Sequence, residues 1–269
     1  VVEGLEAIRY NAHRGFTLQY QLLLAVLRVD DPQEIVAKKL GLVADFVDIV
    51  LARRVWNFKS IAYSNMLYWA FIVMRDIRRL DVDALSAKLI ERLDEQPQFA
   101  DNERLRRHQQ NHYQVHHLLA RMTHFVEAEC GVASTFDQYV VRKAKKPYEV
   151  EHLWADKFER HTDEFDHPAD FDEYRNHVGG LVLLPRGFNQ SLGDKSYEDK
   201  LAHYNAQNVL VRSLNPACYE NNPSFSAFLG RSALPFKSHA VFKKSDLDER
   251  QGLYREIAEA VWSVGRLTV

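Results

Sequence analysis

The residues best suited to chemistry lie between residues 148 and 200. Glu151 and His152 are neighbours in a stretch that reads Tyr-Glu-Val-Glu-His-Leu-Trp, and Asn176 and Asn189 follow downstream. A neutral imidazole can take a proton from water near pH 7, while carboxylate and amide oxygens are ligands that suit Mg²⁺ or Mn²⁺. These residue types in this order predict a one-metal nuclease site, in which the cation stabilises the charge that develops on a phosphate.

The elements expected around these residues are a hairpin and a helix. A first strand at residues 148–154 carries the Glu-His pair, and the Gly179-Gly180 pair precedes a second, apolar strand at residues 181–184. Asn189 then lies at the start of the following helix. Residues 155–175 between the strands form an acidic, polar segment, for which we expect a loop.

A basic segment leads directly into the first strand. It consists of four cations, which we call the basic strip: Arg142, Lys143, Lys145 and Lys146. Phosphate contacts supply most of the non-specific affinity for nucleic acid, so the strip is expected to bind DNA beside the site. A solvated linker is the alternative interpretation.

The rest of the chain has apolar residues at helical spacing. Before the site, helices are predicted at residues 3–28, 35–50 (with Gly41 as a break), 60–79, 83–93 and 105–129; after it, at residues 201–210, 217–230 and 246–262. The predicted class is therefore mainly α, a helical array that encloses the small hairpin and helix of the site. The expected domains are a helical domain at 1–139, a nuclease core at 140–212 and a C-terminal helical segment at 213–269 that packs on the core.

Two further patterns in the helical part have open interpretations. Arg75, Arg78 and Arg79 form one basic cluster and Arg104, Arg106 and Arg107 another, and each is either a solvated helix end or a phosphate contact. His108, His112 and His116 repeat every four residues, so on one helix they form either a solvent-facing stripe or a metal site.

Composition restricts the class of protein. The 269 residues are 46% hydrophobic and 27% charged, with a net charge of −2, as in a folded globular protein with no overall attraction to polyanions. Two cysteines are too few for a disulfide framework, and no apolar run has the length of a membrane span, so a cytoplasmic location is expected. The chain begins with Val1 rather than Met, which suggests a fragment of a longer protein.

Four segments in order carry a resemblance to a known family. They read YEVEH at Tyr148–His152, NHVGGLVLLP at Asn176–Pro185, NQSLG at Asn189–Gly193 and SYEDK at Ser196–Lys200. Together they resemble the C-terminal HNH nuclease domain of GmrSD-type modification-dependent restriction enzymes, a domain that SspE-like phage-defence proteins also carry. A preceding segment, HLLARMTHF at His117–Phe125, resembles the helix found before that site.

The resemblance implies that the hairpin and the helix after it form a ββα-metal (HNH) unit, and it implies roles for individual residues. His152 is the expected general base, and Glu151 and Asn189 the expected ligands of Mg²⁺ or Mn²⁺. Lys195 or Lys200 is expected to neutralise a phosphate. The partners implied are double-stranded DNA and an NTP-dependent sensor domain that precedes this chain in the same protein, with no membrane. The activity implied is DNA nicking in an anti-phage restriction system that senses DNA modification.

Two departures from the family pattern leave an alternative open. Gly180 stands where the family has a hairpin Asn, and no proline follows the first strand. We expect Asn176 to take over the role of the missing amide, holding His152 in place. The alternative, which Gly180 favours, is a degenerate HNH module that binds DNA or a partner without cutting.

Overall fold

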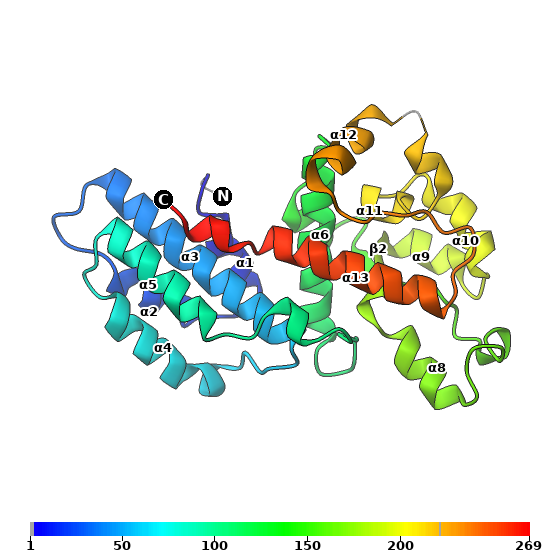
Figure 1. Ribbon diagram of the computed structural model, residues 1–269, viewed down its shortest axis with the longest axis horizontal. Helices are drawn as coiled ribbons and strands as arrows, with labels where there is room; N and C mark the ends of the chain where they lie inside the picture. The colour runs from blue at the N-terminus through cyan, green and yellow to red at the C-terminus, as the bar shows by residue number, and fades with distance from the viewer. Residues whose placement is uncertain (1–2, 221) are drawn as a thin grey trace. The chain divides into compact units, whose positions relative to one another are not determined.

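The computed structural model describes residues 3–220 and 222–269. In this part of the chain helices predominate and the strands form one two-stranded sheet, so the mainly helical class is confirmed (Figure 1). The chain divides into two compact units, one comprising residues up to Asn102 together with Trp262–Val269, and the other Glu103–Val261.

These units differ from the domains expected from the sequence. The expected boundary at 139/140 falls inside the second unit. The reason is that helix α6 (His112–Glu129) packs against elements that precede the hairpin in the chain and against elements that follow it. The C-terminal residues from Trp262 belong to the first unit, where the Ser86 hydroxyl donates to the Leu267 carbonyl. Helical periodicity locates elements but carries no information on which distant helices pack together.

The first unit is a bundle of helices that pack against one another (Figure 1). Its α-helices are α1 (Glu6–His13), α2 (Gln19–Ala25), α3 (Gln33–Trp56), α4 (Tyr63–Ile77) and α5 (Val82–Asp94). The single helix predicted at residues 3–28 is two helices, broken at Gly15, which has a φ of +76°. Gly41 does not break α3; an added Cβ there would lie 3.1 Å from the Gly4 carbonyl oxygen, so it permits a close backbone approach.

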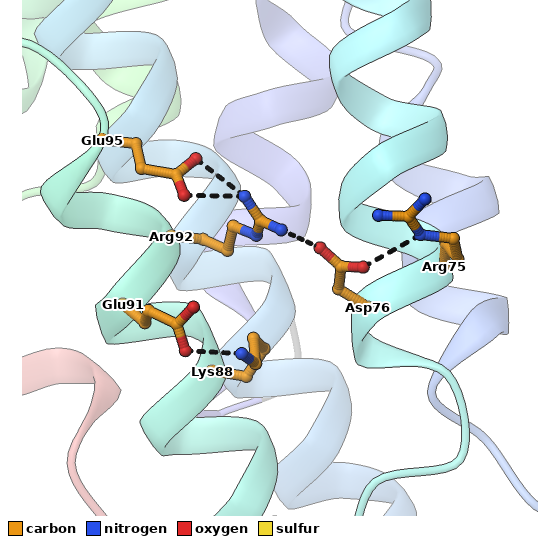
Figure 2. A network of polar contacts seen from close by, with 6 residues as sticks. All are labelled: Arg75, Asp76, Lys88, Glu91, Arg92 and Glu95. Atoms are coloured by element: carbon orange, nitrogen blue, oxygen red, sulfur yellow. Dashed lines mark hydrogen bonds and ion pairs between the residues drawn. The ribbon is translucent and has the colours of Figure 1, made fainter.

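A polar network joins α4 to α5 (Figure 2). Asp76 of α4 accepts hydrogen bonds from Arg75, at 3.1 Å, and from Arg92 of α5. Arg92 also donates to Glu95 of its own helix, at 2.7 and 2.8 Å. Arg75 thus has a partner within the fold, which favours the helix-end interpretation for this member of its basic cluster.

The second unit surrounds the hairpin with helices. In chain order its elements are α6, α7 (Phe136–Val140), β1 (Tyr148–His152), α8 (Pro168–Arg175), β2 (Leu181–Pro185), α9 (Arg186–Leu192), α10 (Tyr197–Tyr204), α11 (Val209–Arg212), α12 (Pro223–Ser232) and α13 (Lys244–Val261). The acidic segment expected as a loop therefore contains a helix, α8. Its first turn has the proline favoured there, and the His167 imidazole accepts from the Ala169 backbone N–H.

Strands β1 and β2 pair in antiparallel register, with Glu151 opposite Val182 and His152 opposite Leu181. All of β2 except its last residue is buried, since α6, α9 and α11 pack on it. Beyond the strand, Trp154 is buried in an aromatic core and donates its indole N–H to the Phe242 carbonyl, at 2.7 Å. The hairpin is therefore a rigid base for the side chains at the end of β1.

The helix predicted at residues 105–129 begins only at His112. Residues 105–107 are extended instead: the Val178 N–H donates to the Leu105 carbonyl and the Arg107 N–H to the Asn176 carbonyl, at 2.9 and 2.8 Å. His108 lies outside the helix, so the histidine stripe does not form. This distant backbone pairing, which no local pattern reveals, brings Arg107 to the hairpin.

The two glycines before β2 are explained by helix α13. A Cβ at Gly179 would lie 2.6 Å from backbone atoms of Gln251 and Leu247, so only glycine fits. At Gly180 a Cβ would lie 3.1 Å from the Leu247 Cδ1 atom. The hairpin Asn of the family pattern would therefore have to displace Leu247 in this chain.

Candidate active site

Glu151 and His152 end strand β1 and have different partners. Neighbouring residues of a strand point to opposite faces. The Glu151 carboxylate pairs with Lys200 of α10, and the His152 ring pairs with Asn176, at the C-terminal end of α8. Three elements thus position the two groups.

The contact with Asn176 selects the tautomer of His152. The Asn176 Nδ2 atom donates to the Asp172 carbonyl at 2.8 Å, so the amide oxygen Oδ1 faces His152 Nε2, 3.0 Å away. An amide oxygen only accepts, and Nε2 must therefore carry the proton. This leaves Nδ1 of His152 with a free lone pair, as a general base requires.

His152 is neutral at physiological pH. Burial, followed by the positive charge of Arg175, lowers the pKa of His152 to about 3, although the bond to Asn176 acts in the opposite direction. Arg107 and Lys200 add smaller contributions of the same sign as Arg175. The imidazole is held in the form that can accept a proton.

Lys200 lies behind Glu151 rather than on the surface. Its buried ammonium group donates to Glu151 Oε1 at 2.5 Å and to the His152 carbonyl at 3.0 Å. Burial raises the pKa of Glu151, and the charge of Lys200 opposes that rise. Both of these contacts hold Lys200 at the end of β1, and its expected role beside a phosphate stays a prediction.

The other two residues expected at the site are more exposed. Lys195 is exposed and its Nζ lies 3.3 Å from His203 Nε2. Asn189 is half-buried on α9, and in the described part of the chain no hydrogen bond joins its side chain to Glu151 or His152. The structure brings together Glu151, His152, Asn176 and Lys200, while the convergence of Asn189 on the same point stays a prediction.

The donor types near β1 fit a hard divalent cation in part. The Glu151 carboxylate and the Asn189 amide are oxygen donors of the kind that Mg²⁺ or Mn²⁺ prefers. The Lys200 ammonium on Oε1 is a competitor, because a cation there would have to share the carboxylate with it or displace it. The family reported below implies a divalent metal, whose identity stays a prediction.

A second group of metal-type donors lies at the start of α13. Atoms of His239, Asp246 and Glu249 lie within 4.8 Å of one another. Each already has a partner: His239 Nδ1 lies 3.0 Å from Asp246 Oδ1, and Glu249 pairs with Lys237 at 2.8 Å. Asp246 also accepts from the backbone N–H of Lys243, the residue immediately before α13, as the carboxylate of a capping box does.

Most of the basic strip faces a cavity of about 1010 Å³ at the opposite end of the hairpin from His152. Its lining includes three members of the strip together with Tyr148, Arg186 and Arg212. Arg186 pairs with Glu149 at 2.6 Å. The cations of the strip are exposed, but they lie at the end of the hairpin away from His152, so their role in DNA binding stays a prediction.

Neutralising all four residues of the basic strip with alanine is expected to weaken DNA binding whatever the DNA sequence. Each lost phosphate contact should lower the slope of log affinity against log salt by about 0.9. Fluorescence anisotropy over a salt series measures this slope. The control removes Lys38 and Lys88, which pair with glutamates on the first unit; an equal change in slope for both variants would contradict a specific role of the strip.

Asn176→Ala should lower the nicking rate by about 10²-fold, because the His152 ring loses the bond that fixes its position. Asn176→Asp keeps an acceptor for His152 Nε2, and we expect it to recover part of the rate. Single-turnover plasmid nicking measures both, with Asn205→Ala, an exposed amide on α10, as the control. A native rate in Asn176→Ala would contradict this role.

A groove borders the site on the side of Asn176. It has a volume of about 680 Å³, and Arg106, Arg107, His108 and His112 form its basic wall. From the sequence, Arg107 belonged only to a cluster with two open interpretations, and Arg175 was only part of a polar segment. For Arg175, the one feature of the sequence that pointed to the site was that it immediately precedes Asn176.

None of the helices in residues 3–220 and 222–269 has the length and apolar character needed to cross a membrane.

The chain matches the family model described as GmrSD restriction endonucleases, C-terminal domain, over residues 81–251. Comparison with curated proteins and with solved structures found no match. The matched residues include the whole of the hairpin, the helix α9 and every residue expected at the site, and they form more than half of the chain. The chain belongs to the C-terminal domain family of the GmrSD restriction endonucleases.

Proposed function

We propose that this chain is a metal-dependent DNA endonuclease of the HNH type, which cuts one strand at a time. The observation that carries the proposal is the geometry of His152: a neutral imidazole, fixed through Nε2 by Asn176, with Nδ1 free and a carboxylate as its neighbour in the strand. The family of restriction endonucleases supports nuclease activity.

In the proposed reaction His152 Nδ1 takes the proton from the attacking water, while Asn176 keeps the ring in place. Glu151 and Asn189 would hold Mg²⁺ or Mn²⁺. When bound, the cation stabilises charge on the phosphate and on the leaving oxygen. Lys200 positions the Glu151 carboxylate from behind.

The proposed substrate is double-stranded DNA, held in part by the basic strip. The chain would be the effector of an anti-phage restriction system that senses DNA modification, with an NTP-dependent sensor domain in the N-terminal part of the same protein and a cytoplasmic location. The description of the family as restriction endonucleases supports this wider role.

Incubation with supercoiled plasmid tests the proposal. We expect open-circular product with Mg²⁺ or Mn²⁺ and none with EDTA. Product at the same rate in EDTA, or no product under any metal condition, would contradict a metal-dependent nickase.

A second function has a specific observation in its favour. The Lys200 ammonium sits on Glu151 Oε1, where a metal ligand is expected, and Gly180 replaces the family's hairpin Asn. A degenerate module that binds DNA without cutting would have these features. Plasmid binding without nicking, in the presence of either metal, would support this alternative.

A further inference from the structure

Arg107 is attached to the same residue that fixes His152. Its backbone N–H donates to the Asn176 carbonyl at 2.8 Å, and the Asn176 side chain contacts the His152 ring at 3.0 Å. A second backbone hydrogen bond, from the Val178 N–H to the Leu105 carbonyl, ties the same two segments together. The backbone of Arg107 is therefore held next to the residue that contacts the imidazole.

The guanidinium group of Arg107 has no protein partner in residues 3–220 and 222–269. The residue is half-buried, its Nε atom is buried without a hydrogen-bond acceptor, and no carboxylate lies within ion-pair distance. Leaving a buried donor unsatisfied costs free energy, and a charged one costs more. Such a group is best explained by an anion that binds it.

A second arginine, Arg175, also lies near His152, but it follows His152 in the chain whereas Arg107 precedes it. Its Nε donates at 3.0 Å to the carbonyl of Trp154, two residues after His152. In the described part of the chain its two terminal nitrogens have no hydrogen bond, and neither Asp156 nor Asp172 forms an ion pair with it. A second half-buried guanidinium group thus has free donors near the imidazole.

Neighbouring arginines do not share this property. Arg106 lines the same groove, but its guanidinium pairs with Glu173 at 2.5 Å, and Arg255 lies 3.7 Å from Glu103. Arg107 and Arg175, whose charges both act on the His152 ring, therefore have guanidinium donors without a protein partner.

We propose that Arg107 and Arg175 bind the scissile phosphate of the DNA backbone and hold it against His152, in the groove bordered by Arg107 and Asn176. The proposal rests on the proposed nuclease function, to which it adds a phosphate site. A planar guanidinium matches two phosphate oxygens at once, and it stabilises the charge that grows on them during hydrolysis.

Arg107→Ala tests the site through two measurements on the full chain. The single-turnover nicking rate at saturating plasmid should fall by about 10² to 10³, as when one preorganised donor to a reacting oxyanion is removed. The salt slope of duplex binding, measured in EDTA, should fall by about 0.9 for one lost phosphate contact. Arg107→Lys, which keeps the charge but not the two-pronged geometry, should recover the slope and only part of the rate.

The control is Arg104→Ala, an exposed arginine three residues away that does not line the groove; it should leave the nicking rate within a few-fold of native. Arg107→Met, which keeps the apolar stem, replaces the alanine variant if that variant melts below the native chain. A native nicking rate together with a native salt slope in the alanine variant, or in the methionine variant that replaces it, would overturn the proposal. If the native chain nicks no plasmid, a slope change confined to Arg107 supports the phosphate site and overturns the nuclease alone.

Discussion

Replacing His152 with alanine is expected to lower the single-turnover rate of plasmid nicking by about 10² to 10⁴, the usual cost of losing a general base. DNA affinity should stay near native, because the imidazole acts in the chemical step and its lone pair on Nδ1 makes no ground-state contact with phosphate. Rate and affinity are measured on the same preparation by gel and by anisotropy.

The pH dependence of the native rate gives an independent check on the same residue. With a folded-state pKa lowered to about 3, His152 stays neutral across the range in which an ordinary histidine titrates. The rate should therefore show no loss from imidazole protonation between about pH 8 and 5. His203→Ala, at an exposed histidine of α10, is the matched control; similar losses in both histidine variants, or nicking by His152→Ala within a few-fold of native, would refute the assignment.

Lys200→Met should destabilise the fold by about 3–5 kcal/mol, because it leaves the Glu151 carboxylate buried without its counter-ion. Both partners are well enclosed, with side-chain exposures of 2% for Lys200 and 12% for Glu151. The free energy of unfolding in urea measures the loss. Activity should fall too, since the same ammonium group holds the His152 carbonyl.

The pH dependence of this loss has a defined sign. Burial raises the pKa of Glu151 in the folded state, and removing Lys200 raises it further. The folded carboxyl then holds its proton more tightly than the unfolded one, so the loss is largest at neutral pH and shrinks in acidic buffer. Adding Glu151→Leu to Lys200→Met should restore most of the stability; a double variant as unstable as Lys200→Met would show that the pair is not the cause.

The hairpin could be predicted because its signals are local. The second strand, expected at residues 181–184, spans Leu181–Pro185, and Glu151 and His152 end the first strand as expected. A short apolar run preceded by glycines is typical of a strand that follows a turn. The contact of Asn176 with the imidazole was also anticipated, from the absence of an amide at Gly180, although it is made to the ring rather than to the backbone.

The remaining features depend on contacts between residues far apart in the chain. Arg107 was placed on a helix, since residues 105–129 have helical periodicity, but its backbone pairs with Asn176 instead. Lys200 was expected near a phosphate, and the burial that directs it to Glu151 has no local signature. The sequence shows only that Gly179 precedes the second strand, whereas the backbone of α13 requires a glycine there.

Hydrolysis of DNA beside His152 is expected to require a metal ion held by Glu151 and Asn189. Titration of Mg²⁺ into plasmid nicking reactions of the native chain, Glu151→Gln and Asn189→Ala tests it most directly. Removing one oxygen ligand should raise the Mg²⁺ concentration for half-maximal rate by about tenfold or more, with activity partly recovered at high Mg²⁺. Nicking that persists in EDTA, or variants whose metal dependence matches the native chain, would contradict the claim.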